Sequence, residues 1–151
     1  MLQGQIGILE KQLKDFANKD ERCKRIQEIN GVGPITACAI IAAMGDPKNF
    51  KNGRHFSAWL GLVPRQNSSG SKEQLLGISK RGDAYLRSLL IHGARAALQF
   101  APKREDYRSK WVTKKATERG FNKATVALAN RNARVIWAML AKNESYKEIA
   151  A

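Results

Sequence analysis

Apolar residues recur at helical spacing along most of this chain, starting from its first residues. The first stripe repeats every three or four residues, at Leu2, Ile6, Leu9, Leu13 and Phe16. This heptad-like pattern predicts an amphipathic helix. The stripe covers about two heptads, so it fits either the end of a longer coiled coil or a helix packed on the core of the same domain.

Residues 21–45 predict two short helices joined by a glycine-rich turn. A charged segment over 21–29 is followed by NGVGP at 30–34 and then by an apolar, alanine-rich segment. The pattern resembles a helix-hairpin-helix motif, in which backbone N–H groups at the start of a helix bind a DNA phosphate. Two interpretations remain open: Gly31 and Gly33 hold a phosphate, or the turn only packs two helices together.

The rest of the pattern predicts further helices and one segment that is not helical. The expected helices cover 55–60, 83 to the break at Pro102, 103–119 and 122–142. Between the first two of them, the polar segment 62–78 predicts a hairpin or an irregular loop. The predicted fold class is therefore mostly α: a helical domain with a helix-hairpin-helix-like motif and a small β-hairpin or irregular loop insertion.

Positive charge is concentrated in the second part of the chain. The 151 residues include 27 Lys and Arg against 13 Asp and Glu, and residues 51–151 carry +13 of the net +14. Such a field attracts polyanions, among which nucleic acid is the commonest. No membrane partner is expected, because no apolar run approaches ~20 residues. The charged helix over 103–119 either follows a nucleic-acid backbone or is a solvated face.

The segment 60–82, LGLVPRQNSSGSKEQLLGISKRG, carries the candidate chemistry. Ser68 and Ser69 precede a glycine in a predicted turn, where a hydroxyl can attack a phosphate or bind it by a hydrogen bond. Cations that could hold the phosphate flank this turn: Arg65, Lys80, Arg81 and Arg87. The alternative is an ordinary polar turn on a basic surface, with each of these cations solvated.

Four sequence blocks carry a family resemblance. They are INGVGPITA at 29–37, FSAWLGLVPRQNSSG at 56–70, ISKRGDAYLR at 78–87 and NKATVALA at 122–129. Together they resemble the C-terminal domain of a bacterial and archaeal insertion-sequence transposase family, which pairs a RuvC-like DEDD domain with a serine domain. The first block alone is common among DNA-repair proteins, whereas the second and third blocks are specific to the family. Asp83 departs from the pattern, since the family often has Asn there.

The resemblance implies a transposase that cleaves and rejoins DNA through a serine nucleophile. That role falls on Ser69, with Ser68 as the alternative because the two serines are adjacent. No cofactor is expected in this chain, and a divalent metal ion (Mg²⁺) is expected on the DEDD domain, which is missing from it. We expect 1–20 to be the end of a coiled-coil-like inter-domain helix and 21–151 to be the transposase domain, excised or truncated and inactive when isolated.

The resemblance also implies the partners and the location. We expect DNA as partner, a bridge RNA as guide in some members, self-association of the full-length protein, and a cytoplasmic location with the nucleoid of a bacterium or archaeon. One alternative function is a non-catalytic helix-hairpin-helix module that binds nucleic acid through its backbone. Another is a protein-interaction domain that oligomerises through residues 2–16.

Overall fold

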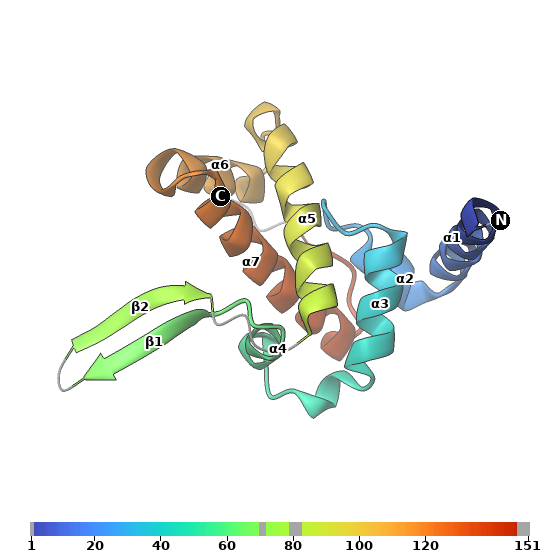
Figure 1. Cartoon of the computed structure of the whole chain (residues 1–151), viewed down its shortest axis with the longest axis horizontal. Helices are drawn as coiled ribbons and strands as arrows, with labels where there is room; N and C mark the ends of the chain where they lie inside the picture. The colour runs from blue at the N-terminus through green and yellow to red at the C-terminus, as the bar shows by residue number, and fades with distance from the viewer. Residues whose placement is uncertain (1, 70–71, 79–82, 148–151) are drawn as a thin grey trace.

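The computed structural model describes residues 2–69, 72–78 and 83–147. Within them the fold is mostly helical, as predicted, and contains one two-stranded sheet (Figure 1). In chain order the elements are α1 (Leu2–Lys19), α2 (Glu21–Ile26), α3 (Pro34–Met44), the 3₁₀ turn η1 (Pro47–Asn49), α4 (Gly53–Trp59), β1 (Pro64–Ser69), β2 (Lys72–Ile78), α5 (Ala84–Phe100), the 3₁₀ turn η2 (Ala101–Lys103), α6 (Tyr107–Arg119) and α7 (Phe121–Lys142).

Helix α7 lies at the centre of the helical body, with α4, α5 and α6 packed along it (Figure 1). Its buried positions recur at helical spacing and include Ala124, Leu128, Ala129, Ala133 and Ile136. Helix α5 contributes the facing stripe of Leu86, Leu90, Ala94 and Leu98. Each large apolar side chain buried in this way stabilises the fold by about 1.5–3 kcal/mol, so this helix pair anchors the domain.

Several helix boundaries follow from local side chains and agree with the predictions. The Asp83 carboxylate accepts a hydrogen bond from the N–H of Leu86 at 3.0 Å and caps α5. Gly45 and Gly120 end α3 and α6 with φ of 63° and 96°, a conformation that favours glycine. The residues that determine these helix ends therefore lie within a few positions of the ends themselves.

The charged helix begins four residues later than predicted. Its carboxylate cap is Asp106, which accepts a hydrogen bond from the N–H of Ser109 at 2.9 Å, and α6 starts at Tyr107. Ala101–Lys103 form a separate 3₁₀ turn with Pro102 near its start. The prediction of a helix over all of 103–119 was therefore wrong at its start, because an Asp cap is a stronger signal than a run of charge.

The glycine-rich turn between α2 and α3 packs directly against α5. Gly31 has φ of 100°, and a Cβ added there would lie 2.6 Å from the carbonyl oxygen of Gly93. A Cβ added at Gly93 would lie 1.9 Å from the carbonyl oxygen of Gly31. Neither position has room for a side chain, so the turn is joined to α5 by close approach of the two backbones.

A buried arginine connects the same turn to α6 and α7. Arg108 is 8% exposed, and its guanidinium donates to the carbonyl oxygen of Asn30 at 3.3 Å and to Oδ1 of Asn132. The ring of Tyr146 lies 5.9 Å from the guanidinium carbon. Burial lowers the pKa of Arg108 below its usual high value. This group fixes three separate parts of the chain relative to one another.

Helix α1 packs on α2 and α3 but leaves its predicted apolar stripe largely in solvent. Leu2 is 77% exposed and Phe16 is 50% exposed, whereas Ala17 is fully buried. Packing within this domain therefore covers little of the stripe, and its role in a longer coiled coil stays a prediction. None of the helices in the described residues is long and apolar enough to cross a membrane.

Candidate nucleic-acid interface

The predicted serine turn lies on a β-hairpin that extends away from the helical body (Figure 1). Strands β1 and β2 are antiparallel, with Ser68 opposite Glu73 and Ser69 opposite Lys72. Ser69 is the last residue of β1, so its backbone lies at the end of the strand remote from α4. The glycine that follows it is outside the described residues.

The structure describes the backbone of two of the four predicted phosphate-binding cations, Arg65 and Arg87. The backbone of Arg65 lies at the base of the hairpin, where the register of the two strands shifts between Pro64 and Gln66. Lys80 and Arg81 are outside the described residues. The convergence of Arg65, Lys80 and Arg81 on the two serines therefore stays a prediction.

Arg87 is half-buried on the first turn of α5. Its guanidinium donates a hydrogen bond to the carbonyl oxygen of Leu60 at 3.3 Å. Leu60 follows α4 and precedes β1 by four residues, so this contact ties α5 to the segment that leads into the hairpin. Arg87 thus supports the base of the hairpin, and its contact with a phosphate stays a prediction.

The two predicted phosphate-binding glycines also differ from each other. Gly31 is packed against the backbone of Gly93, whereas Gly33 is exposed at the start of α3 with no atom within 4 Å of an added Cβ. Only Gly33 therefore lies beside open space. The packing interpretation of the turn accounts for Gly31, and phosphate binding at either glycine stays a prediction.

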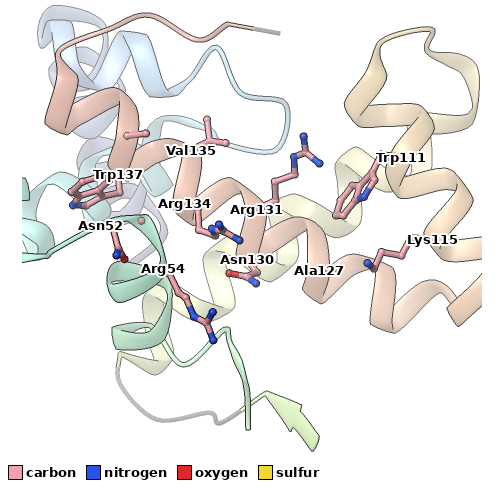
Figure 2. Close-up of a pocket in the computed structure, with 12 residues that line it drawn as sticks. Asn52, Arg54, Trp111, Lys115, Ala127, Asn130, Arg131, Arg134, Val135 and Trp137 are labelled. Atoms are coloured by element: carbon pink, nitrogen blue, oxygen red, sulfur yellow. The ribbon is translucent and has the colours of Figure 1, made fainter. Parts of the chain in front are cut away.

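A basic groove of about 820 Å³ lies between α4, α6 and α7 (Figure 2). Four cations line it: Arg54 from α4, Lys115 from α6, and Arg131 and Arg134 from α7. Among the residues that the structure describes, no Asp or Glu lines the groove. Within the described residues, none of these four cations forms an ion pair. We call this feature the α7 groove.

Trp111 holds two of these cations in place. The guanidinium carbon of Arg131 lies 4.7 Å from the centre of the Trp111 ring, and Nζ of Lys115 lies 5.0 Å from it. Both distances are within the range of cation–π attraction. Trp111 is half-buried on the wall of the groove.

Trp59 is the last residue of α4 and is more exposed than Trp111. It is 37% exposed, and its ring packs against Phe50 and Phe56 with centroid distances of 5.5 and 5.9 Å. Phe56 is fully buried and Phe50 is nearly so, and both anchor this segment to the core. The partly exposed Trp59 covers them from the solvent side.

Close packing of α4 on α7 sets the width of the groove. A Cβ added at Gly53 would lie 2.9 Å from the carbonyl oxygen of Arg134. Ser57 donates its hydroxyl to Oδ1 of Asn130, which fixes the middle of α4 to α7. The indole N–H of Trp137 donates to the carbonyl oxygen of Pro47 at 2.9 Å and holds the preceding loop. Arg54 is therefore brought beside Arg134 by backbone packing.

The α7 groove could not be predicted from a contiguous motif, because its cations come from separate segments. One signal is present in the sequence: α7 has no Asp or Glu in its 22 residues. Arg131 and Arg134 are three residues apart and so share a helix face. This face is basic, with no acidic residue on the helix to balance it.

No ligand set for a metal ion occurs in the described part of the chain. Nowhere in it do three or more His, Cys, Asp or Glu side chains come together as a cluster that could hold an ion. His55 accepts a hydrogen bond at Nδ1 from the N–H of Lys51 at 3.0 Å, and His92 is exposed on α5. The Mg²⁺ was expected on a DEDD domain and not on this chain, and that expectation stays a prediction.

Several curated proteins are similar to this chain over nearly all of its length. It is 51% identical over 142 residues to a transposase for insertion sequence element IS1111A from Coxiella burnetii, covering 94% of this chain and 39% of that protein. It is 47% identical over 146 residues to a probable family 20 transposase from Pseudomonas aeruginosa, covering 97% and 43%. The IS1328 transposase of Yersinia enterocolitica is 42% identical over 133 residues, covering 88% and 40%.

The chain thus spans about two fifths of the length of these relatives. The model of the transposase family IS116/IS110/IS902 matches residues 23–109, which run from α2 into α6 and include the β-hairpin. That match covers more than half of the chain, and the relatives agree with it. The chain belongs to the IS116/IS110/IS902 family of transposases.

Proposed function

We propose that this chain is the part of an insertion-sequence transposase that binds DNA and supplies the serine nucleophile for strand cleavage and rejoining. Ser69 is the proposed nucleophile, and Ser68 is the alternative. The observation that supports the proposal is the family match, which contains the hairpin on which both serines lie. The position of Ser69 at the end of β1 suits a residue that must reach a strand outside the helical body.

The proposed step exchanges one phosphodiester bond for another. The Ser69 hydroxyl oxygen attacks a DNA phosphorus and loses its proton, and the bond from phosphorus to the leaving strand breaks. The departing oxygen takes up a proton, which leaves a serine–DNA phosphodiester. Rejoining is the reverse attack by a strand hydroxyl, which releases the serine. Bond energy is conserved, so no further co-reactant is needed.

Activation of the serine is assigned to groups outside the described residues. A serine hydroxyl is a weak nucleophile without a base or a metal ion beside it. A divalent ion bound by a DEDD domain would supply that activation when present. The residues of this chain that we assign to the step are Arg65, Lys80 and Arg81, which would neutralise the charge that develops on the phosphate.

Further partners are part of the same proposal. A bridge RNA and other copies of the full-length protein are the proposed partners besides DNA. The exposed apolar stripe of α1 supports self-association, since the domain itself covers little of it. We further propose that 1–20 end an inter-domain helix, that 21–151 form the transposase domain, and that the domain is inactive by itself.

The test separates chemistry from binding at one residue. Ser69→Ala is introduced into the longest reading frame that contains this chain, and transposition of a marked element is counted in cells. We expect transposition to be abolished while the DNA affinity of the purified protein stays within about twofold, because a serine contributes little to backbone binding. Transposition that persists in Ser69→Ala would remove the nucleophile assignment.

A non-catalytic nucleic-acid-binding module is the second candidate, and the α7 groove favours it. Within the described residues, the groove offers four cations without ion pairs, and no Ser or Thr lines it. Under this hypothesis Ser69→Ala leaves both transposition and binding unchanged. The same experiment therefore discriminates the two candidates.

A further inference from the structure

We propose that the α7 groove binds one strand of a phosphodiester backbone, as a second nucleic-acid contact separate from the serine hairpin. The inference rests on the proposed function in one respect: the domain binds nucleic acid. It adds the place, the residues and the chemical class of the contact. The groove was not among the sites expected from the sequence, and it is made only of residues in the described helices and in the turn before α4.

The polar groups of the groove are hydrogen-bond donors. Guanidinium and ammonium groups have no acceptor atoms. Asn130 has its carbonyl oxygen occupied by the Ser57 hydroxyl, and Asn52 has its carbonyl oxygen occupied by the N–H of His55 at 2.8 Å, which leaves the amide N–H groups of both. A lining rich in donors suits a ligand with only acceptors, and the oxygens of a phosphodiester are such a ligand.

The charges favour a polyanion over a neutral ligand. Four cations share a groove of about 820 Å³, and the described residues place no carboxylate on its walls, so the cations repel one another when the groove is empty. A strand that places successive phosphates along the groove removes this repulsion. A groove of this volume is too small to enclose a duplex, so we assign it one strand of backbone, either unpaired or at the edge of a duplex.

Trp111 is a positioning residue in this contact. Arg131 and Lys115 both lie over its ring, and Arg131 also lies 5.5 Å from the ring of Tyr107. The ring is therefore engaged by cations and is not offered as a stacking surface for a base. We assign Trp111 the role of holding two cations ready for phosphate.

The groove and the hairpin share one element. Helix α4 contributes Arg54 to the groove at its start, and the chain leaves its other end for β1. The helix has seven residues and is roughly 10 Å long, so a strand held in the groove lies near the base of the hairpin. The groove can thus fix where a strand passes relative to the serines.

The main experiment compares two double variants with the same change in charge. Arg54→Gln/Arg134→Gln removes two exposed groove cations. Lys110→Gln/Lys114→Gln removes two exposed cations of α6 that lie outside the groove and pair with Glu105 and Glu118 at 3.3 and 3.9 Å. Affinity of the 151-residue chain is measured between 50 and 200 mM salt for duplex DNA, single-stranded DNA and single-stranded RNA of one sequence. Thermal unfolding of both variants is recorded alongside.

We expect the groove variant to lose about tenfold in affinity at low salt and to reduce the slope of log K against log salt by about 2. The control pair should lose less than about threefold, and neither variant should melt earlier than wild type by more than a few degrees. The strand with the greatest loss identifies which backbone occupies the groove. Equal losses in the two variants, or none in the groove variant, would overturn the proposal.

A second variant tests the role of Trp111. Trp111→Leu should weaken binding to an ordinary strand and to an abasic strand by the same factor, because its effect passes through Arg131 and Lys115. A stacking role would remove the effect on the abasic strand, and that result would overturn the positioning role. A failure of the groove proposal is thus visible as unchanged binding, whereas a failure of the serine proposal is visible only in transposition.

Discussion

The hairpin and the α7 groove differ in how the chain builds them. The hairpin is made by two neighbouring strands that pair with each other and extend away from the body (Figure 1). The groove is made by α4, α6 and α7, and its cations are separated by as many as 80 residues in the sequence, from Arg54 to Arg134. The first can be recognised from a contiguous motif, and the second exists only once the core has formed.

This difference suggests a division of work within the domain. A local hairpin outside the core can carry a reactive group to a substrate without disturbing the packing of the body. A groove between packed helices holds its charges at fixed positions. Here the ring of Trp111 lies against Arg131 and Lys115 and holds both in place. We therefore assign strand binding to the groove, whose charges are held rigidly, and strand cleavage to the hairpin, which extends from the body. The predictions below test this division in order of decreasing effect.

The largest effect should come from removing the nucleophile of strand cleavage, which is Ser69 or its neighbour Ser68. Ser69→Ala should reduce strand cleavage by at least roughly a thousandfold, since the attacking oxygen is lost. Ser68→Ala should reduce it by less than about tenfold. In a filter-binding assay, both variants should bind DNA with the affinity of the wild type. A larger loss for Ser68→Ala would move the nucleophile to the neighbouring residue.

The next largest effect should come from the turn between α2 and α3. Gly31→Ala and Gly93→Ala should each lower the free energy of unfolding by roughly 3 kcal/mol, because either added Cβ meets backbone of the other segment. Urea unfolding measures this loss. Folded protein of both variants should bind DNA equally well. Weaker binding by Gly31→Ala alone would instead favour the phosphate-binding interpretation of the turn.

A smaller loss is expected at the buried arginine of the body. Arg108→Met should lower the free energy of unfolding by about 2 kcal/mol, because the carbonyl of Asn30 and Oδ1 of Asn132 lose their donor. The control is Arg104→Met, which removes an exposed pair with Asp106 and should cost less than about 1 kcal/mol. Equal losses would mean that burial of Arg108 contributes nothing specific.

The smallest effect should come from a change in the spacing of α4 from α7, which sets the width of the groove and so its affinity for DNA. Gly53→Ala should weaken DNA binding by about fivefold at low salt, because the added Cβ displaces α4 from Arg134 by a fraction of an ångström. Gly7→Ala is the matched control, since an added Cβ there has no atom within 4 Å and Gly7 lies on α1, away from the residues that line the groove. If the two variants bind alike, the spacing of α4 from α7 does not control the contact.

Local signals in the sequence predicted much of the fold. Asp83 and Gly120 mark helix ends through contacts with residues a few positions away, so their roles could be predicted. The mostly helical class followed from the spacing of apolar residues. The start of α6 was misplaced, because a run of charge over 103–119 has helical propensity but no information about where the helix begins.

Contacts between distant segments could not be predicted in this way. Gly31 looked like part of a phosphate-binding turn, and only the tertiary structure shows that Gly93 lies against it. Arg54 and Arg134 are 80 residues apart and belong to no common motif, so only the packing of α4 on α7 brings them together. For the candidate site, the sequence identified the hairpin that carries the serines but not the groove that we propose as its companion.

In this account the hairpin cleaves DNA and the α7 groove binds a strand. The most direct test is to trap and map the covalent protein–DNA adduct. A nicked or suicide DNA substrate is incubated with the full-length protein, and the adduct peptide is identified by mass spectrometry. We predict an adduct on Ser69 in wild type, none in Ser69→Ala, and a full yield in Arg54→Gln/Arg134→Gln once the DNA concentration is raised to saturation. An adduct on another residue, or a groove variant that forms none at saturating DNA, would contradict the account.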